Sequence, residues 1–449
     1  MLQKQKLFYG GNRMTQKNSK IVFAFQEIRN KYLISNQGIY LGKYLETLDA
    51  RTVVVERDYV DKDYLIDYSK FYARSFKCYE RFTIRLHFFS KNFSEEDFKK
   101  MLASGNVDQL MKEYCGFVVI KPISDRDDKP LIGRTILKTY PKEINHGKRH
   151  FLTEKHHVSL YGILLDMDSL PYKTQDIAVG ACATTAMWVS LYPLNKLFNV
   201  PLYSSYEITE KSVTLPSEFR SFPSEGLSFG QMINFIKSIG LDTEIINVEH
   251  KRSEEIDSLI SAAVTSYLNC GLPIIVELAL KKDNKIYGHH ATVISGYRIG
   301  SSDHIEEFYV HDDQIGPYSK AIPTKDLAKW KNEWITKYGY SELRVQKLLI
   351  PVYPKIRLSF SRIYAKFAII KQRYASNDVN VNLLLEQVNS YKSFILKSSV
   401  KNKNEVLVSP VPRFLWIIRI SFTGKPARDI LFDGTSVIPK IIRYVDFQF

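Results

Sequence analysis

Three residues in the central part of the chain have side chains suited to nucleophilic catalysis: Cys182, His290 and Asp312. A thiol is mostly protonated at neutral pH, and the thiolate is the species that attacks. An imidazole can take the proton of the thiol and pass it to a leaving group. A carboxylate can hold that imidazole in the right tautomer and orientation. The order Cys, His, Asp along the chain therefore predicts a thiol-based catalytic triad.

Gln175 is a fourth candidate, seven positions before Cys182. Acyl transfer passes through a tetrahedral intermediate, whose oxyanion is stabilised by hydrogen-bond donors placed in advance. The side-chain amide of Gln175 and the backbone N–H of Cys182 are suitable donors. We therefore expect these two groups to form an oxyanion hole.

The elements around these residues can position them for such chemistry. Cys182 stands in GACATTAMW at the start of a predicted helix over 182–198, where the helix dipole favours a thiolate. His290 begins the strand-like run HATVISGYR, and Asp312 ends the run EEFYVHD. A second helix is predicted within GLSFGQMINFIKSIGLDTEI, and LPIIVELAL predicts a further strand. Helices with several strands behind them indicate an α+β domain.

These local sequences resemble the papain-like fold of the C39-like peptidases. In that family a Gln precedes a Cys at a helix start, a Gly-His strand ends in Gly-Tyr, and an apolar strand ends in Asp. The matching segments here are Gln175, CATTA from Cys182, GHHATVISGY and FYVHD. Four features depart from the family pattern: Ala183 replaces a common Gly, a second histidine precedes His290, Asp313 stands where Pro is usual, and the spacing from Gln175 to Cys182 is about one residue longer than typical.

Two of the site assignments have a neighbouring alternative. Successive side chains of a strand point to opposite faces, so only one of His289 and His290 can meet Cys182. We favour His290, because it precedes Ala-Thr-Val-Ile as in the family pattern. For the carboxylate we favour Asp312 over Asp313.

The resemblance implies a cysteine peptidase that cleaves a peptide or protein substrate through an acyl-thioenzyme, without a metal or organic cofactor. Two other functions remain open. The same triad could transfer the acyl group to an amine, as transglutaminase-like or acyltransferase enzymes do. Alternatively, the domain could bind a peptide without cutting it.

The length of 449 residues predicts more than one domain, and charge divides the chain into three parts. Lys and Arg against Asp and Glu number 29 to 21 in residues 1–170, 18 to 21 in 171–350 and 16 to 6 in 351–449. We predict a mixed α/β N-terminal module over 1–165, the papain-like domain over 166–350, and a basic α+β module over 351–449. The fold class is thus α+β, a catalytic helix packed on an antiparallel sheet between two further α/β-type modules.

The flanking modules carry no motif that assigns a role. In the first, we expect a helix capped by Ser94 and strands in RTVVVERDYV, CGFVVIKPI and PLIGRTILKTY. In the last, we expect a helix around NLLLEQVNSYKSFIL and strands in EVLVSP, RFLWIIRISF and ARDILFDG. The positive surplus of the last module predicts an acidic partner, either nucleic acid or an acidic protein.

The cysteines and the hydropathy bear on the compartment. Cys78, Cys115, Cys182 and Cys270 are widely scattered without a CxxC pair, which argues against a zinc site or a disulfide framework. We expect Cys78, Cys115 and Cys270 to be core residues. The sequence has no run of roughly 18–20 apolar residues, so no membrane span is predicted. A cytoplasmic location fits these features best.

Overall fold

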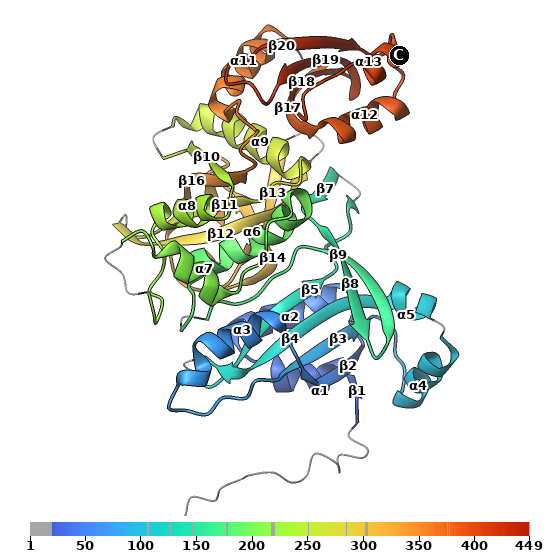
Figure 1. The fold of residues 1–449 in the computed structure, drawn as a ribbon, viewed down its shortest axis with the longest axis vertical. Coiled ribbons are helices and arrows are strands. Elements are labelled where there is room, and N and C mark those ends of the chain that lie inside the picture. Colours follow the sequence, from blue (N-terminus) through green and yellow to red (C-terminus); the bar gives the residue numbers. More distant parts are fainter. Residues whose placement is uncertain are drawn as a thin grey trace, which may run out of the picture.

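The computed structural model describes residues 20–448 apart from 106, 126, 145–146, 177, 217–220, 250, 284, 301–303, 375 and 377. The protein has a mixed α+β architecture built on several antiparallel sheets, as the sequence predicts. Figure 1 shows three bodies stacked along the long axis: the N-terminal body in blue and teal, the central body in green and yellow, and the C-terminal body in orange and red.

The N-terminal body is built on one five-stranded antiparallel sheet in the order β1-β2-β3-β4-β5. Its strands are β1 (Val22–Ala24), β2 (Thr52–Tyr59), β3 (Thr83–Phe89), β4 (Tyr114–Ser124) and β5 (Pro130–Leu137). Alternation along β2 places Val53 and Val55 in the core on one face of the sheet, while Val54 enters a different core on the other face. Both faces of this sheet are therefore buried.

Helices and a hairpin cover the two faces. The first face holds α1 (Phe25–Tyr32) and α2 (Asn36–Thr47). The second holds α4 (Glu95–Ser104), α5 (Val107–Glu113) and the two-stranded sheet of β8 (Glu154–Leu160) and β9 (Ile163–Ser169). The predicted cap is confirmed: Ser94 and Asp97 form a reciprocal capping box at the start of α4. Beside them, α3 (Lys62–Lys70) and the 3-10 turn Tyr72–Arg74 face the central body.

The central body contains a nine-stranded antiparallel sheet. Its strands are β6 (Glu143–Ile144), β7 (Gly147–Phe151), β10 (Asp242–Asn247), β11 (Ile274–Lys282), β12 (Lys285–Ile299), β13 (Ile305–Asp312), β14 (Gly316–Pro323), β15 (Lys329–Lys331) and β16 (Glu342–Val352). Two of them, β6 and β7, come from the chain before residue 165. The strand β7 pairs with β12, so this segment adds to the central sheet although the hairpin after it packs on the N-terminal sheet.

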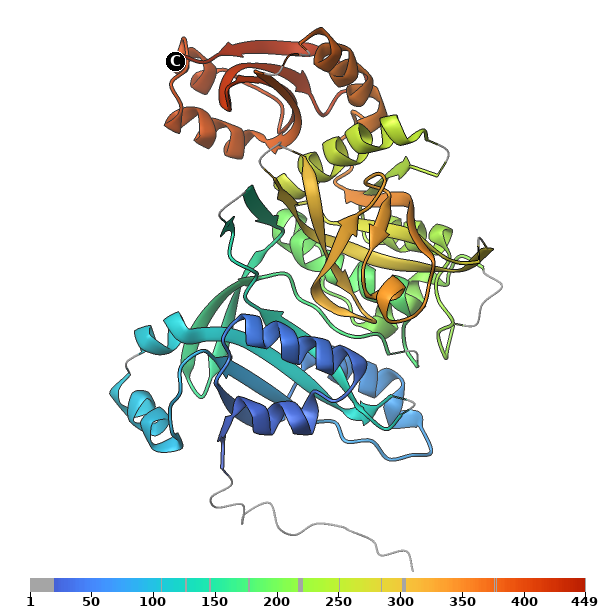
Figure 2. The same cartoon turned by 180° about the vertical axis from the view of Figure 1, so that it is seen from behind.

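The helices of the central body are α6 (Cys182–Phe198), α7 (Ser205–Ser212), α8 (Phe229–Ser238), α9 (Ser253–Asn269) and α10 (Glu333–Thr336). The bounds of α6 agree with the predicted helix over 182–198. The residues from Ala183 to Leu194 are all buried, and the helix packs against β11, β12 and β13. Figures 1 and 2 show α6 on one face of the central sheet, seen from the helix side and from the sheet side.

Aromatic side chains join the first two bodies. Tyr44 of α2 stacks on Tyr318 of β14, with 5.9 Å between the ring centroids. Beside them, a Cβ atom on Gly316 would lie 2.0 Å from a ring carbon of Tyr40. Only glycine fits this close approach, so the N-terminal body packs directly on the strand that follows Asp312.

The C-terminal body has a four-stranded antiparallel sheet in sequence order. Its strands are β17 (Val379–Gln387), β18 (Phe414–Phe422), β19 (Lys425–Asp433) and β20 (Ile441–Asp446), and its helices are α11 (Phe360–Arg373), α12 (Val388–Lys397) and α13 (Lys403–Val408). One face of the sheet continues the core of the central body, and α12 and α13 cover the other. The predicted helix around NLLLEQVNSYKSFIL is present only from Val388, because residues 382–387 belong to β17. The predicted strand in EVLVSP is wrong, because this segment begins as a helix.

Two further predictions concern membrane-spanning helices and the burial of the cysteines. None of the helices in the described ranges has the length and apolar character needed to cross a membrane. Cys115 and Cys270 are buried, as expected, but Cys78 is exposed and the expectation that it belongs to the core is wrong. It lies in an irregular segment after the 3-10 turn.

Candidate active site

Cys182 is the first residue of α6 and is partly exposed. Ala181 precedes it in an extended conformation and makes no side-chain cap. The first backbone N–H groups of a helix have no partner within the helix, and the helix dipole favours negative charge there. A thiolate at this position is therefore stabilised, and the N–H groups beside it are suited to bind an oxyanion.

The loop before α6 is held by the N-terminal body. Asp176 accepts hydrogen bonds of 2.7 Å at both carboxylate oxygens from the hydroxyl of Tyr72, and Lys121 lies 3.5 Å from the same carboxylate. Within the loop, the backbone N–H of Gly180 donates to the carbonyl of Asp176. All these side chains are buried. The position of Cys182 thus depends on contacts far away in sequence, and no local pattern pointed to Tyr72 or Lys121.

His290 lies on β12, opposite Leu278 of β11, with its side chain buried. Its Nε2 atom is 3.1 Å from Oδ2 of Asp312, and the thiol of Cys182 is near enough to act on its pKa. Burial alone would lower the pKa of His290. The negative charge of Asp312, 3.1 Å away, outweighs this and, together with the nearby thiol of Cys182, raises the pKa of His290 well above the ordinary value. The imidazolium form is therefore favoured beside the thiol.

Asp312 ends β13 and is fully buried. The indole Nε1 of Trp334 in α10 donates to its Oδ2 at 2.8 Å, and the backbone N–H of Gln314 donates to its Oδ1 at 3.0 Å. Burial favours the protonated acid, but the charge of His290 and these hydrogen bonds lower the pKa of Asp312 below its usual value. Asp312 is thus an ionised, oriented partner of His290. The contribution of Trp334 had no signal in the sequence.

Asp313 also faces the imidazole. Its Oδ1 lies 3.7 Å from Nε2 of His290, and its side chain is 2% exposed. Neither carboxylate oxygen has a hydrogen-bond partner among the described residues. Burial raises the pKa of Asp313 to about 7; the charge of His290 opposes this effect, and the charge of Asp312 adds to it. Two neighbouring carboxyl groups therefore share one imidazole.

His289 lies on the opposite face of β12. Its side chain is 55% exposed, and Nδ1 is 3.7 Å from Oε1 of Glu277. Strand alternation thus separates the two histidines, with His290 toward α6 and His289 toward solvent.

Gln175 is half-buried and lines a cavity of about 720 Å³. The wall of this cavity combines the loop before α6 with the N-terminal body, through residues such as Tyr72, Tyr79, Asp125 and Asp176. Among the described residues, no hydrogen bond joins Gln175 to Cys182. Its proposed part in the oxyanion hole stays a prediction.

The site also has a set of potential metal ligands. One atom each from His290, Asp312 and Asp313 lie within 4.8 Å of one another. All three side chains are closed off from solvent, and both oxygens of Asp312 already accept hydrogen bonds. His290 also interacts with the thiol of Cys182. This arrangement fits a proton-transfer site better than an ion site, and we assign no metal to it.

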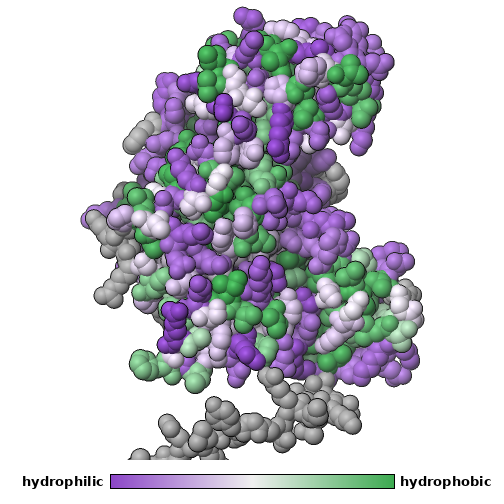
Figure 3. Space-filling model, in the orientation of Figure 1, coloured by the Kyte–Doolittle hydropathy of each residue, from purple (hydrophilic) through white to green (hydrophobic). Residues whose placement is uncertain are grey.

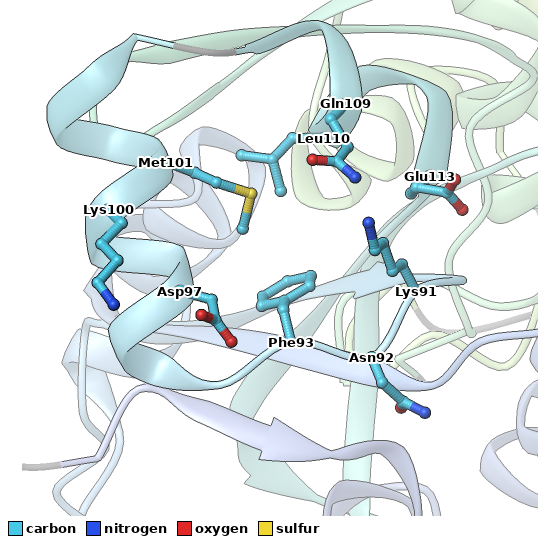
Figure 4. A pocket seen from close by; sticks show the side chains of 9 residues that line it. All are labelled: Lys91, Asn92, Phe93, Asp97, Lys100, Met101, Gln109, Leu110 and Glu113. Carbon is cyan, nitrogen blue, oxygen red and sulfur yellow. The ribbon is translucent and has the colours of Figure 1, made fainter.

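Other hollows lie away from these residues. Figure 4 shows a pocket of about 320 Å³ between α4, α5 and the segment after β3, with Phe93, Met101 and Leu110 in its wall. A larger cleft of about 1140 Å³ lies beside the contact between α9 and the C-terminal body and is lined by residues of α9, α11 and β17. Neither pocket is lined by a residue of the predicted triad.

The basic residues of the C-terminal body only partly form a surface. Arg419 turns inward and pairs with buried Asp429 at 2.8 Å, and Arg428 pairs with Asp446 at 2.6 Å. Lys403 donates to the carbonyls of Leu396 and Ser398 at the end of α12. The exposed basic residues include Lys397, Lys401 and Lys425. On the face shown in Figure 3, hydrophilic and hydrophobic residues are interspersed.

Comparison with known proteins gives no relative to assist the assignment: no protein-family model matches the chain, and the curated proteins contain no significant match.

Proposed function

We propose that this protein is a papain-like cysteine peptidase of the C39-like type. The observation that carries the proposal is the arrangement around His290, which interacts with the thiol at the start of α6 and lies 3.1 Å from a buried, oriented carboxylate. A buried histidine in a purely structural role needs only one satisfied partner. Here a thiol, an imidazole and a carboxylate lie together, and these are the three chemical groups that a thiol hydrolase needs.

The reaction then follows from the positions of these groups. The sulfur of Cys182 attacks the carbonyl carbon of a peptide, and the oxyanion accepts hydrogen bonds from the N–H groups at the start of α6 and from Gln175. The imidazolium of His290 gives its proton to the leaving amine, so the C–N bond breaks and a thioester remains. His290 next takes a proton from water, whose oxygen attacks the thioester and releases the acid and the thiol. Asp312 orients His290 throughout.

The peptidase is tested by incubating the full chain with a mixture of peptides of diverse sequence and identifying new termini by mass spectrometry. We expect cleavage by the wild type and none by Cys182→Ala. The half-buried thiol leaves room for the methyl group, so Cys182→Ala should fold normally. Equal cleavage by both proteins would exclude Cys182 as the nucleophile.

The same assay separates hydrolysis from acyl transfer. With a primary amine present, a transferase yields acyl-amine products whose masses differ from those of the free acids, whereas a hydrolase yields the acids alone. A peptide-binding module without catalysis gives neither product. The proposed peptidase predicts free acids as the main products at modest amine concentration.

Location and partners belong to this proposal as well. We place the enzyme in the cytoplasm, because its scattered thiols suit a reducing compartment. The exposed lysines of the C-terminal body support the docking of an acidic partner, nucleic acid or protein. A nucleic-acid complex would weaken steeply with added salt, because each neutralised phosphate releases counterions.

A further inference from the structure

Two adjacent aspartates face one imidazole because the chain turns between them. Along a straight strand, neighbouring side chains point to opposite faces. Here β13 ends at Asp312, and the backbone N–H of Ile315 donates to the carbonyl of Asp312 in a tight turn. Asp313 is the first residue inside this turn. Its carboxylate therefore comes to lie 3.7 Å from Nε2 of His290, beside the shorter contact from Asp312.

The two carboxyl groups differ in their support. Asp312 accepts hydrogen bonds from Trp334 and from the backbone of Gln314, which stabilise its charged form. Asp313 has no such partner among the described residues and is equally buried. One imidazolium can balance one buried negative charge. A second buried carboxylate without hydrogen bonds is costly, so Asp313 is the group that takes up a proton.

The surroundings of Asp313 contain several titratable groups. They are His290 on β12, Asp312 on β13, Cys182 on α6 through the imidazole, Tyr172 before α6, and Tyr338 after α10, which faces Asp312. Burial, and next the charges of the two aspartates, raise the pKa of Tyr172 well above its usual value, so this hydroxyl stays protonated in the neutral range. No other described cation is paired with the Asp313 carboxylate.

We propose that Asp313 is a positioning residue that acts through His290 and makes the reactivity of Cys182 depend on pH across the neutral range. The inference rests on the proposed function, because it needs Cys182 and His290 to react as a pair. Ionised Asp313 stabilises the imidazolium and with it the thiolate. Protonated Asp313 carries no charge and therefore does not stabilise the imidazolium. The site thus gains activity as the carboxyl group loses its proton, at a pH near 7.

The rate at which iodoacetamide alkylates Cys182 reports the thiolate without any knowledge of the substrate. We would measure it by peptide mass spectrometry on the full chain from pH 5 to 9, for wild type and Asp313→Asn. At pH 5 the wild-type carboxyl is already protonated, so the two rates should agree. At pH 8 the variant should react about tenfold more slowly, the effect of about one pKa unit lost with a charge at this distance.

Two further variants show whether a change in the alkylation rate is due to the charge of Asp313. Glu306→Gln removes a carboxylate from an exposed position on the same strand, where Glu306 pairs with Arg298, and should leave the profile unchanged. Asp313→Ser is a second uncharged variant, should the amide not fit the site. A difference that is the same at pH 5 and pH 8 would indicate a structural role.

Two results would overturn the inference, and they have different meanings. If Asp313→Asn and wild type share one profile, Asp313 does not act on the site, and the peptidase proposal is untouched. If wild-type Cys182 reacts no faster than exposed Cys78 at any pH, the pairing with His290 itself is wrong and the proposed function falls with it.

Discussion

The indole nitrogen of Trp334 donates a 2.8 Å hydrogen bond to Oδ2 of Asp312. That same oxygen is 3.1 Å from Nε2 of His290, and the rings of His290 and Trp334 are in contact with 4.9 Å between centroids. Trp334 therefore fixes both members of the Asp–His pair, although it stands 22 residues beyond Asp312. Short helix α10 supplies a part of the site that no motif marks.

The first prediction concerns this contact. Trp334→Phe keeps the aromatic packing but removes the N–H donor, so Asp312 loses a hydrogen bond to a charged group worth about 1.5–3 kcal/mol. We expect turnover to fall by roughly 10- to 100-fold. Steady-state kinetics with a cleaved peptide would check this. Trp330→Phe is a matched control, because its Nε1 donates to the carbonyl of Leu327 and not to the triad.

The two histidines of β12 give the second prediction. His290→Ala should abolish peptide cleavage, because triad members act as a unit and the loss of one costs several orders of magnitude. His289→Ala should retain most activity, since its half-exposed side chain contacts Glu277 on the other face. An inactive His289→Ala beside an active His290→Ala would reverse our assignment.

The third prediction concerns Gln175. If its amide binds the oxyanion, Gln175→Ala should lower turnover by roughly 10²–10³, the range for the loss of one donor. The value of KM should change little, since the interaction forms mainly in the transition state. Unchanged turnover would remove Gln175 from the site and leave it as a wall residue of the 720 Å³ cavity.

The fourth prediction is a dependence of stability on pH. Burial raises the pKa of Asp313 to about 7, above its value in the unfolded chain of about 3.9. The protonated form is thus favoured by folding, and its contribution is complete below about pH 4 and lost as pH rises to 7. The Asp313→Asn variant has no carboxyl group to ionise at this position, so it does not lose stability in this way. Its melting temperature should exceed that of wild type more at pH 8 than at pH 5, as followed by calorimetry.

An equal difference at both pH values would mean that the carboxyl group is not desolvated as described. A more stable but less reactive Asp313→Asn would show that the buried carboxyl is kept for reactivity at the expense of stability.

The sequence predicted those elements whose signals are local. The helix over 182–198 and the cap at Ser94 have clear patterns of composition and capping, and both agree with the structure. The run of leucines in β17 suggested a helix, but pairing with β18 makes it a strand whose alternate residues Val381, Leu383 and Leu385 enter the core. Tertiary pairing outweighed local preference there.

The segment EVLVSP shows the opposite case. Its valines favour a strand, yet α13 forms and packs Val406 into the core beneath α12. A segment this short has weak intrinsic preference, and packing of one apolar face decides its structure.

In the candidate site, too, some features could be predicted from local sequence and others depend on tertiary contacts. The order and strand context of His290 and Asp312 could be read from the sequence, because they follow from alternation and strand ends. The contacts from Trp334 and Tyr72 could not, because they depend on how α10 and the N-terminal body fold back onto the site. The approach of Asp313 also depends on a turn geometry that its local sequence does not specify.

The central claim is that His290 activates Cys182, and alkylation tests it most directly. Cys78 is an exposed thiol in the same chain and serves as an internal reference. Wild-type protein is treated briefly with limiting iodoacetamide at pH 7, and modification of both cysteines is measured by peptide mass spectrometry. We predict that Cys182 reacts much faster than Cys78 in the wild type and in His289→Ala, and that this advantage disappears in His290→Ala. Preferential reaction at Cys78, or an advantage of Cys182 that persists in His290→Ala, would contradict the account.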